Sequence, residues 1–172
     1  MKLTFNKLLL AGLLSLLSIS SSHAADVSLT DLVDLKADTH QAESRQLPIL
    51  VMFSASYCGY CSVIKEEFLK PMLISGDYTD KVIIRVLEID ADDDIRDIDG
   101  KQIDPDELAQ RYNIHMTPTL AFVGPRGNEL TQKLIGLTTI DFYGGYLDDA
   151  IDVSLNQLRG NHSLSKAPKL AP

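Results

Sequence analysis

The chain has 172 residues, with 16 lysines and arginines against 24 aspartates and glutamates, and a formal net charge of -8 at pH 7. This acidic balance argues against nucleic acid or an anionic membrane surface as the main partner, because both would repel the protein. The length suits one domain with a sizeable hydrophobic core, even after the N-terminal segment described next is removed.

The first 24 residues have the pattern of a cleaved signal peptide. Lys2 and Lys7 form a basic region, residues 8–19 an apolar region, and Ser22-His23-Ala24 a small-x-small cleavage site. The apolar region is shorter than the roughly 20 residues of a membrane span, so a retained anchor is the weaker alternative. The mature chain, with 14 basic and 24 acidic residues and a net charge of about -10, is expected to begin near Ala25 in the periplasm, where disulfides persist.

The first two elements after this segment are predicted to be a helix and a strand. The helix is expected to begin at Ser28, with Asp31 three residues later as an approximate capping box. Its later part, up to Ser44, is too polar to bury much surface. Residues 48–53 are a short apolar run without polar alternation, which is typical of a buried strand.

The only two cysteines, Cys58 and Cys61, follow that strand and open a second helix. Apolar residues recur at helical spacing as far as Leu73, and Pro71 is expected to bend the helix because proline has no backbone N–H. A loop over residues 75–80 ends it. The β-branched run after that loop predicts a second strand over residues 82–89.

Residues 90–100 are an acidic stretch, which we interpret as a solvated loop. A calcium-binding EF-hand loop is excluded, because that spacing places Ile95 at the first ligand position. Asp104 as N-cap and Pro105 at the first helical position predict a third helix that runs through Tyr112.

The C-terminal part is predicted to contain a hairpin and a long helix. Residues 119–123 form the third buried strand, and a turn rich in proline and glycine leads to a return strand over residues 130–135. The last helix is expected over residues 139–159, weakened by Gly144-Gly145 and ended by Gly160. Residues 25–160 therefore make one domain, and residues 161–172 are expected to be a disordered tail.

The order of these elements predicts an α/β fold. Helices and strands alternate in the first part, which implies parallel pairing, and the short turn in the second part implies an antiparallel hairpin. A central mixed β-sheet with helices on both faces follows.

This order, with Cys-x-x-Cys at the first strand–helix junction and Thr117-Pro118 before the third strand, resembles the thioredoxin superfamily over residues 27–158. The segments 97–101, 107–109 and 117–119 are similar to those of exported thioredoxin-related proteins of the SoxW type. The dipeptide Gly59-Tyr60 between the cysteines, together with Thr117, is similar to the disulfide isomerase DsbC. The chain has no counterpart of the dimerisation domain of that isomerase, so the resemblance implies a thioredoxin fold and a monomeric reductant.

Two cysteines at this spacing on a helix start can cycle between dithiol and disulfide. Cys58 is assigned as the nucleophile, because unpaired N–H groups and the partial positive charge of the helix start favour its thiolate. Cys61, deeper in the first turn, is assigned as the resolving thiol, which attacks the mixed disulfide intramolecularly. A merely structural role is disfavoured, since a disulfide that closes so short a loop contributes only about 2 kcal/mol.

The resemblance implies further roles beside the dithiol. The peptide bond before Pro118 is expected to be cis. The backbone groups of Thr117 are expected to form hydrogen bonds with an extended segment of the substrate, which would pair with them like an added β-strand. Gly59 and Tyr60 are the other substrate-binding candidates, and Tyr57 stands where thioredoxin has tryptophan.

The chain departs from thioredoxin in the apolar positions beneath the dithiol. Met52 and Val86 stand where thioredoxin has a buried aspartate and a lysine, so the usual proton relay for Cys61 is missing. Proton transfer must then use water or another group, for which Lys65 and Glu66, one turn further along the helix, are the candidates.

These features predict an exported thiol–disulfide oxidoreductase that reduces protein disulfides in the periplasm. The resemblance implies re-reduction by a membrane thiol donor of the DsbD or CcdA kind, and no cofactor or metal is expected. One alternative is a disulfide oxidase or isomerase that uses the same residues. The other is a copper-binding chaperone with Cys58, Cys61 and His115 as ligands, since thiolates and imidazole both suit copper.

Overall fold

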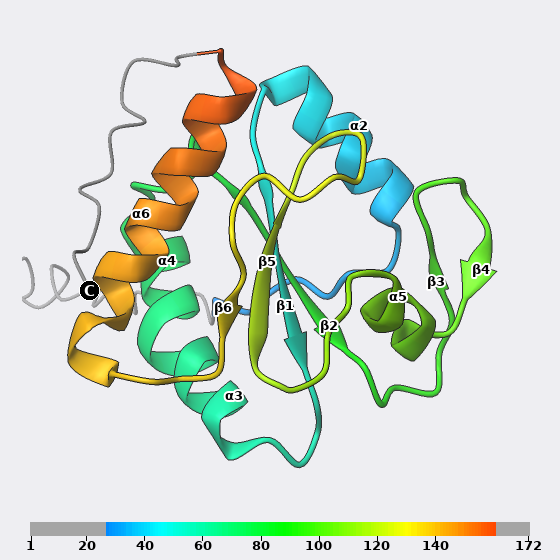
Figure 1. Ribbon diagram of the computed structural model, residues 1–172, viewed down its shortest axis with the longest axis horizontal. Helices are drawn as coiled ribbons and strands as arrows, with labels where there is room; N and C mark the ends of the chain where they lie inside the picture. The colour runs from blue at the N-terminus through cyan, green and yellow to red at the C-terminus, as the bar shows by residue number, and fades with distance from the viewer. Residues whose placement is uncertain (1–26, 161–172) are drawn as a thin grey trace, which may run out of the picture.

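The computed structural model describes residues 27–160. Its centre is a four-stranded mixed sheet with the strand order β2-β1-β5-β6 (Figure 1). Strands β1 and β2 run parallel, whereas β5 is antiparallel to β1 and β6 is antiparallel to β5. The strands are β1 (Ile49–Ser54), β2 (Ile83–Glu88), β5 (Thr119–Val123) and β6 (Leu134–Ile135).

Helices cover both faces of this sheet, which confirms the predicted architecture (Figure 1). On one face lie α2 (Leu35–Arg45) and α5 (Pro105–Arg111). The other face carries α6 (Ile140–Leu158) and the helix that follows the cysteines. The latter consists of α3 (Gly59–Ile64), a π-helical turn (Lys65–Leu69) and α4 (Lys70–Ser75).

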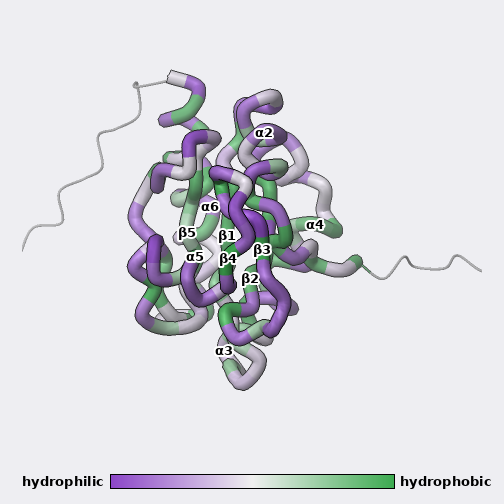
Figure 2. The backbone as a smooth tube through the Cα atoms, turned by 90° about the vertical axis from the view of Figure 1, so that its right-hand side faces the viewer, coloured by the Kyte–Doolittle hydropathy of each residue, from purple (hydrophilic) through white to green (hydrophobic). Residues whose placement is uncertain are grey.

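The central strand β1 separates two hydrophobic clusters. Its odd-numbered residues, such as Phe53, join the cluster beneath α2 and α5, and its even-numbered apolar residues, such as Met52, join the cluster that contains Cys61. Because both faces are covered, every residue of β1 is buried, as its continuous apolar run predicts. Figure 2 shows hydrophobic residues along the central strands and mostly hydrophilic loops outside them.

The predicted helix start at Ser28 is wrong. Helix α2 begins at Leu35, and its N-cap is Asp34, whose carboxylate accepts a hydrogen bond of 2.8 Å from the N–H of Ala37. The residues before it are extended and pair with the edge of β2: Leu32 N–H donates to the carbonyl of Val86 at 2.7 Å. This pairing satisfies backbone groups that a helix start at Ser28 would leave unpaired.

The interruption expected at Pro71 takes the form of the π-helical turn that precedes it. The N–H of Lys70 donates to the carbonyl of Lys65, five residues earlier, so the hydrogen-bond register has already changed where proline cannot donate. The helix then continues to Ser75 and ends at Gly76, whose φ of 74° is the left-handed conformation that favours glycine.

The acidic stretch is more ordered than predicted. Its residues Ile95–Arg96 form strand β3, which pairs with β4 (Gln102–Ile103), just after the stretch, in a small antiparallel ribbon that was not predicted. Ile95 and Ile103 face each other across the ribbon and are buried in the core, which supplies the hydrophobic reason for the pairing. The return strand of the hairpin is shorter than predicted, because only Leu134–Ile135 pairs as a strand.

Strands β2 and β5 and helices α5 and α6 confirm their predicted positions, including Asp104 as the N-cap of α5. In residues 27–160, no helix has the length and apolar character needed to cross a membrane. The predicted signal peptide, residues 1–24, and the predicted C-terminal tail lie outside the described residues.

Candidate active site

The two cysteines lie at the junction of β1 and α3 and form a disulfide, with their Cα atoms 5.2 Å apart. Cys58 is the N-cap of α3, and its own N–H donates to the carbonyl of Ala55 at 3.0 Å. The N–H of Cys61 points at the sulfur of Cys58, at an N–S distance of 3.2 Å. An amide donor in this position stabilises negative charge on the sulfur when the disulfide is reduced.

The two sulfurs differ in their access to solvent. Cys61 is 1% exposed and belongs to the hydrophobic cluster of the sheet face covered by α3, α4 and α6. Cys58 is only partly buried at the start of the helix. An external disulfide can therefore reach Cys58, while Cys61 can react only with a group already bonded to its neighbour.

The loop that carries Pro118 lies at the same end of the sheet as the dithiol. Phe53 near the end of β1 pairs with Thr119 at the start of β5, because these two strands are antiparallel. The Thr117–Pro118 peptide bond is cis, as the resemblance implies, and the carbonyl of Pro118 accepts a hydrogen bond from Gly136. The fold thus places the predicted substrate-binding loop and the cysteines at the same end of the sheet.

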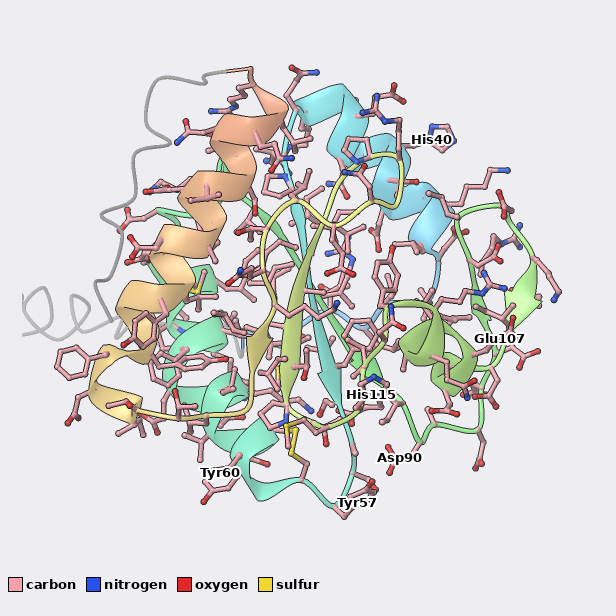
Figure 3. The ribbon with its side chains drawn as sticks, viewed as in Figure 1. His40, Tyr57, Tyr60, Asp90, Glu107 and His115 are labelled. Atoms are coloured by element: carbon pink, nitrogen blue, oxygen red, sulfur yellow. A yellow bond between two sulfur atoms is a disulfide. The ribbon has the colours of Figure 1, made fainter. Side chains whose placement is uncertain are left out.

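Exposed aromatic and apolar side chains border this end of the molecule. Tyr57 is 80% exposed and Tyr60 is 65% exposed, one on each side of Cys58 in the sequence. Figure 3 shows both side chains at the same end as the disulfide, pointing outward. Met116, directly before Thr117, is also exposed. Such side chains offer contact area to a protein partner.

Asp90 fixes the loop before Cys58, a role that the sequence interpretation missed. Its carboxylate accepts hydrogen bonds from the N–H of Ser56 at 3.1 Å and from the Ser56 hydroxyl at 2.6 Å. These bonds, led by that of the hydroxyl and aided by the charge of Lys65, lower the pKa of Asp90. One signal was available: β1 and β2 are parallel, so residues just after both strands meet at one edge of the sheet.

The two positions where thioredoxin has its aspartate and lysine lie in an apolar environment in this structure. Met52 and Val86 are Cα partners across β1 and β2, and both are buried. Of the two proposed replacements, Lys65 forms an ion pair with Glu88 at the end of β2. Glu66 is exposed and pairs with Lys70 at 2.7 Å, so it is directed along the helix surface.

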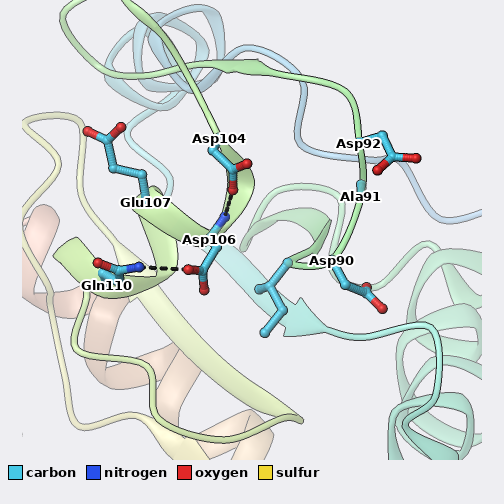
Figure 4. A pocket seen from close by; sticks show the side chains of 8 residues that line it. Asp90, Ala91, Asp92, Asp104, Asp106, Glu107 and Gln110 are labelled. Carbon is cyan, nitrogen blue, oxygen red and sulfur yellow. Dashed lines mark hydrogen bonds between the residues drawn. The ribbon is translucent and has the colours of Figure 1, made fainter.

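A shallow acidic hollow lies beside the site, between the loop after β2 and helix α5 (Figure 4). Within it, Asp104 accepts a hydrogen bond from the N–H of Asp106, and Gln110 donates to the carboxylate of Asp106. In the part of the chain that the structure describes, no three His, Cys, Asp or Glu side chains are placed to hold a metal ion.

Comparison with known proteins gives one family and several solved structures. A family model described as a thioredoxin-like domain matches residues 35–151. Mitochondrial thioredoxin 3 from Saccharomyces cerevisiae, in its oxidized form, is 20% identical over 70% of this chain and 94% of that chain, with a TM-score of 0.47. Thioredoxin O2 from Arabidopsis thaliana, in the oxidized state, is 21% identical over 70% and 93%, with a TM-score of 0.45. A search of curated proteins finds no match.

Proposed function

The chain belongs to the thioredoxin-like domain family, and on that premise we propose that it is an exported protein that reduces disulfide bonds of other proteins in the periplasm. In general terms, a thioredoxin-like fold with a close Cys58–Cys61 pair is that of a thiol–disulfide oxidoreductase. The observation that carries the proposal is the unequal placement of the two sulfurs, one accessible and one buried directly behind it.

The proposed reaction has two steps. The Cys58 thiolate attacks one sulfur of the partner's disulfide, a Cys58–partner bond forms, and the other partner sulfur leaves as a thiolate. The Cys61 thiolate then attacks Cys58, the intramolecular disulfide forms, and the second partner sulfur leaves. Two electrons pass from the dithiol to the partner, whose disulfide becomes two thiols. The second step is fast because the two sulfurs are already held next to each other.

Substrate binding is proposed to use the loop before β5. Thr117 would offer its backbone groups to an extended segment of the partner, which would lie beside Pro118 as an additional strand does. Gly59 and Tyr60 would line the other side of that segment. The exposed rings of Tyr57 and Tyr60 would add apolar contact area around the reacting sulfurs.

The oxidised protein must be reduced again before the next cycle. In the periplasm we propose a membrane thiol donor of the DsbD or CcdA kind, which would attack the Cys58–Cys61 disulfide in the reverse of the two steps above. The predicted signal peptide, residues 1–24, supports this location. We further propose that the protein acts as a monomer.

The test is a trapping experiment in the periplasm with single cysteine variants. Cys61→Ser should accumulate mixed disulfides with partner proteins on non-reducing gels, because the second step cannot occur. Cys58→Ser should accumulate none, and the double variant provides the background. Equal trapping by both single variants would overturn the assigned roles.

The direction of electron flow is tested by the reduction potential of the dithiol. A potential near that of thioredoxin, about -270 mV, would support a reductant. A potential near that of the oxidant DsbA, about -120 mV, would mean that the protein oxidises dithiols in its partners instead. Identification of the proteins captured by Cys61→Ser would then name the substrates.

A further inference from the structure

We propose that the outer face of helix α6 binds a basic amphipathic helix of another protein. The surface consists of Phe142, Tyr146, Asp149 and Val153, which we call the α6 stripe. The proposal goes beyond the disulfide chemistry, because it concerns a surface that the two-step reaction does not use.

Helix α6 has three faces with different surroundings. The buried residues of its core face, which packs on the sheet, are Tyr143, Leu147, Ala150, Ile151, Ser154 and Leu155. A second face turns toward the loop after α4, where the Tyr78 hydroxyl donates to Asp148 at 2.5 Å. One turn further along, Lys81 pairs with Asp152 at 3.8 Å. The α6 stripe occupies the remaining face, which is open to solvent.

The four residues of the α6 stripe form one line along the helix. They follow each other at intervals of four, three and four residues, which places their side chains one above the other. Phe142 is 64% exposed, Tyr146 is 49% exposed and Val153 is 52% exposed. Single exposed apolar residues are common, whereas a contiguous row of large ones is typical of an interaction surface. The alternating spacing is that of a seam at which two helices pack together.

Asp149 defines the charge that the partner must carry. It lies within the stripe, between Tyr146 and Val153, and is exposed. A helix packed on the stripe would cover this carboxylate, which is unfavourable unless the partner places a lysine or arginine opposite it. Helix α6 contains four aspartates and no lysine or arginine, so basic residues beside the seam would be attracted as well.

The same charges disfavour two other occupants. A second copy of the chain would bring its own Asp149 into the same apolar seam, because residue 149 lies near the middle of the stripe. Both copies would also carry the net charge of -8. An anionic lipid surface would be repelled by the aspartates of the helix. A basic segment of another protein meets neither obstacle.

A partner on the α6 stripe would leave the dithiol accessible. Helix α6 runs along the side of the molecule, whereas the disulfide lies at the lower end, where α3 begins (Figure 1, Figure 3). A protein held by α6 would therefore remain close to Cys58 without covering it. Its disulfides would have a raised effective concentration at the active site.

The first experiment uses a synthetic peptide of about four helical turns, with leucines and one central lysine in the seam and further lysines beside it. Fluorescence anisotropy of the labelled peptide measures its affinity for the purified protein. A scrambled peptide of the same composition should bind about tenfold more weakly, because it keeps the charge and loses the seam. Phe142→Ser and Tyr146→Ser should each weaken binding of the ordered peptide about tenfold. Ile74→Ser, at an equally exposed apolar position on α4, should leave it unchanged.

A charge reversal distinguishes a specific contact from general attraction. Asp149→Lys should weaken binding of the lysine-centred peptide about tenfold and strengthen binding of a peptide with glutamate at that centre by a similar factor. Glu43→Lys, at an exposed position on α2, changes the net charge equally and should alter either affinity by less than about twofold. Circular dichroism verifies that these variants, all at exposed positions, are folded.

The second experiment identifies the occupant in the cell. A photoreactive phenylalanine analogue replaces Tyr146, with Ile74 as the control position, and mass spectrometry reads the sequence of the linked segment. A segment of another protein with apolar residues at helical spacing and lysine or arginine beside them supports the proposal.

Several outcomes overturn the proposal. In the cell these are a link to a second copy, to residues 161–172 of the same chain, to lipid or to a segment without that pattern, or no link specific to position 146. With the peptides, they are equal binding of the ordered and scrambled sequences, or an Asp149→Lys variant that does not exchange its preference. Phe142→Ser should still reduce a small aromatic disulfide at the wild-type rate. A wild type without that activity would contradict the proposed function alone.

Discussion

Arg85 on β2 binds the carboxylate of Asp38 on α2 through hydrogen bonds of 2.6 to 3.0 Å from its Nε and Nη2 atoms. Both side chains are largely buried between the helix and the sheet. The same guanidinium donates to the carbonyl of Ile84, so most of its hydrogen-bonding capacity is used. This pair lets a predominantly polar helix pack against the sheet.

Asp38→Ala should therefore be strongly destabilising. It leaves the Arg85 guanidinium partly buried without a counter-charge, and we expect a loss of about 3 kcal/mol in the free energy of unfolding. Urea denaturation followed by circular dichroism measures this. Glu43→Ala, at an exposed position of the same helix, should change the free energy by no more than about 0.5 kcal/mol. An equally small change for Asp38→Ala would show that the pair has little effect on stability.

Asp97 should make the protein sensitive to acid. Its carboxylate accepts hydrogen bonds from the Arg111 guanidinium at 2.8 Å and from the N–H groups of Lys101 and Asp99, and these lower its pKa below the ordinary 3.8. The unfolded chain then takes up the proton at a higher pH than the folded protein. The stabilisation is present above pH 3.8 and is lost as the pH falls through the lowered pKa.

The prediction for Asp97→Asn is a flatter acid limb in the plot of unfolding free energy against pH. The difference from the wild type should be largest near neutral pH and shrink below pH 3.8. Asp99→Asn, in the same loop but exposed, is the control, and its unfolding free energy should depend on acidic pH as that of the wild type does. Parallel curves for wild type and Asp97→Asn would contradict this role.

Tyr112 should affect stability at alkaline pH. Its hydroxyl donates to the carbonyl of Gly127 at 2.9 Å, and burial raises its pKa to about 12. Tyr112→Phe should cost about 1 kcal/mol at neutral pH through the lost hydrogen bond. Because the folded pKa is raised, the wild type should lose stability as the pH rises from about 10 through 12, and Tyr112→Phe should lose less. Thermal melts across this range, with the exposed Tyr146→Phe as control, give the comparison.

The tyrosines beside Cys58 should matter for protein substrates and not for small ones. Tyr57→Ala and Tyr60→Ala should each lower the rate of reduction of a protein disulfide about fivefold, which corresponds to about 1 kcal/mol of lost contact. The rate with a small aromatic disulfide should stay the same. Ile74→Ala removes an equally exposed apolar side chain, roughly 20 Å further along the helix, and should change neither rate. Equal losses with both substrates would place the tyrosines in the chemistry rather than in binding.

The sequence alone was sufficient to predict those strands and helix starts at which the local sequence signals agree with the burial of the residues. The apolar runs of β1 and β5 are buried on both faces, so nothing competes with strand formation, and Asp104 with Pro105 marks the start of α5 in sequence and structure alike. The Cys58–Cys61 pair could be placed at a strand–helix junction from its flanking residues. The cis geometry of Pro118 came only from the resemblance, because an X–Pro bond is trans by default.

Long-range pairings could not be predicted in the same way. The pairing of Leu32 with Val86 decides against a helix at Ser28, and it joins residues more than fifty positions apart. The polar side of α2 is buried because Arg85 lies opposite Asp38, which no periodicity reveals. Lys65 was a candidate for the relay from its spacing to Cys61, but its partner, Glu88, becomes visible only when β2 is placed beside β1.

Helix α6 has a consequence for when the protein can mature. Its residues Tyr143, Leu147 and Ile151 belong to the same hydrophobic cluster as Cys61. In a nascent chain, the hydrophobic cluster that buries Cys61 therefore cannot be complete until residue 151 has been synthesised. Until then its apolar strands need protection from aggregation, and Cys61 lacks part of the hydrophobic cluster that buries it. The burial of Cys61 is therefore completed only when the final helix has packed.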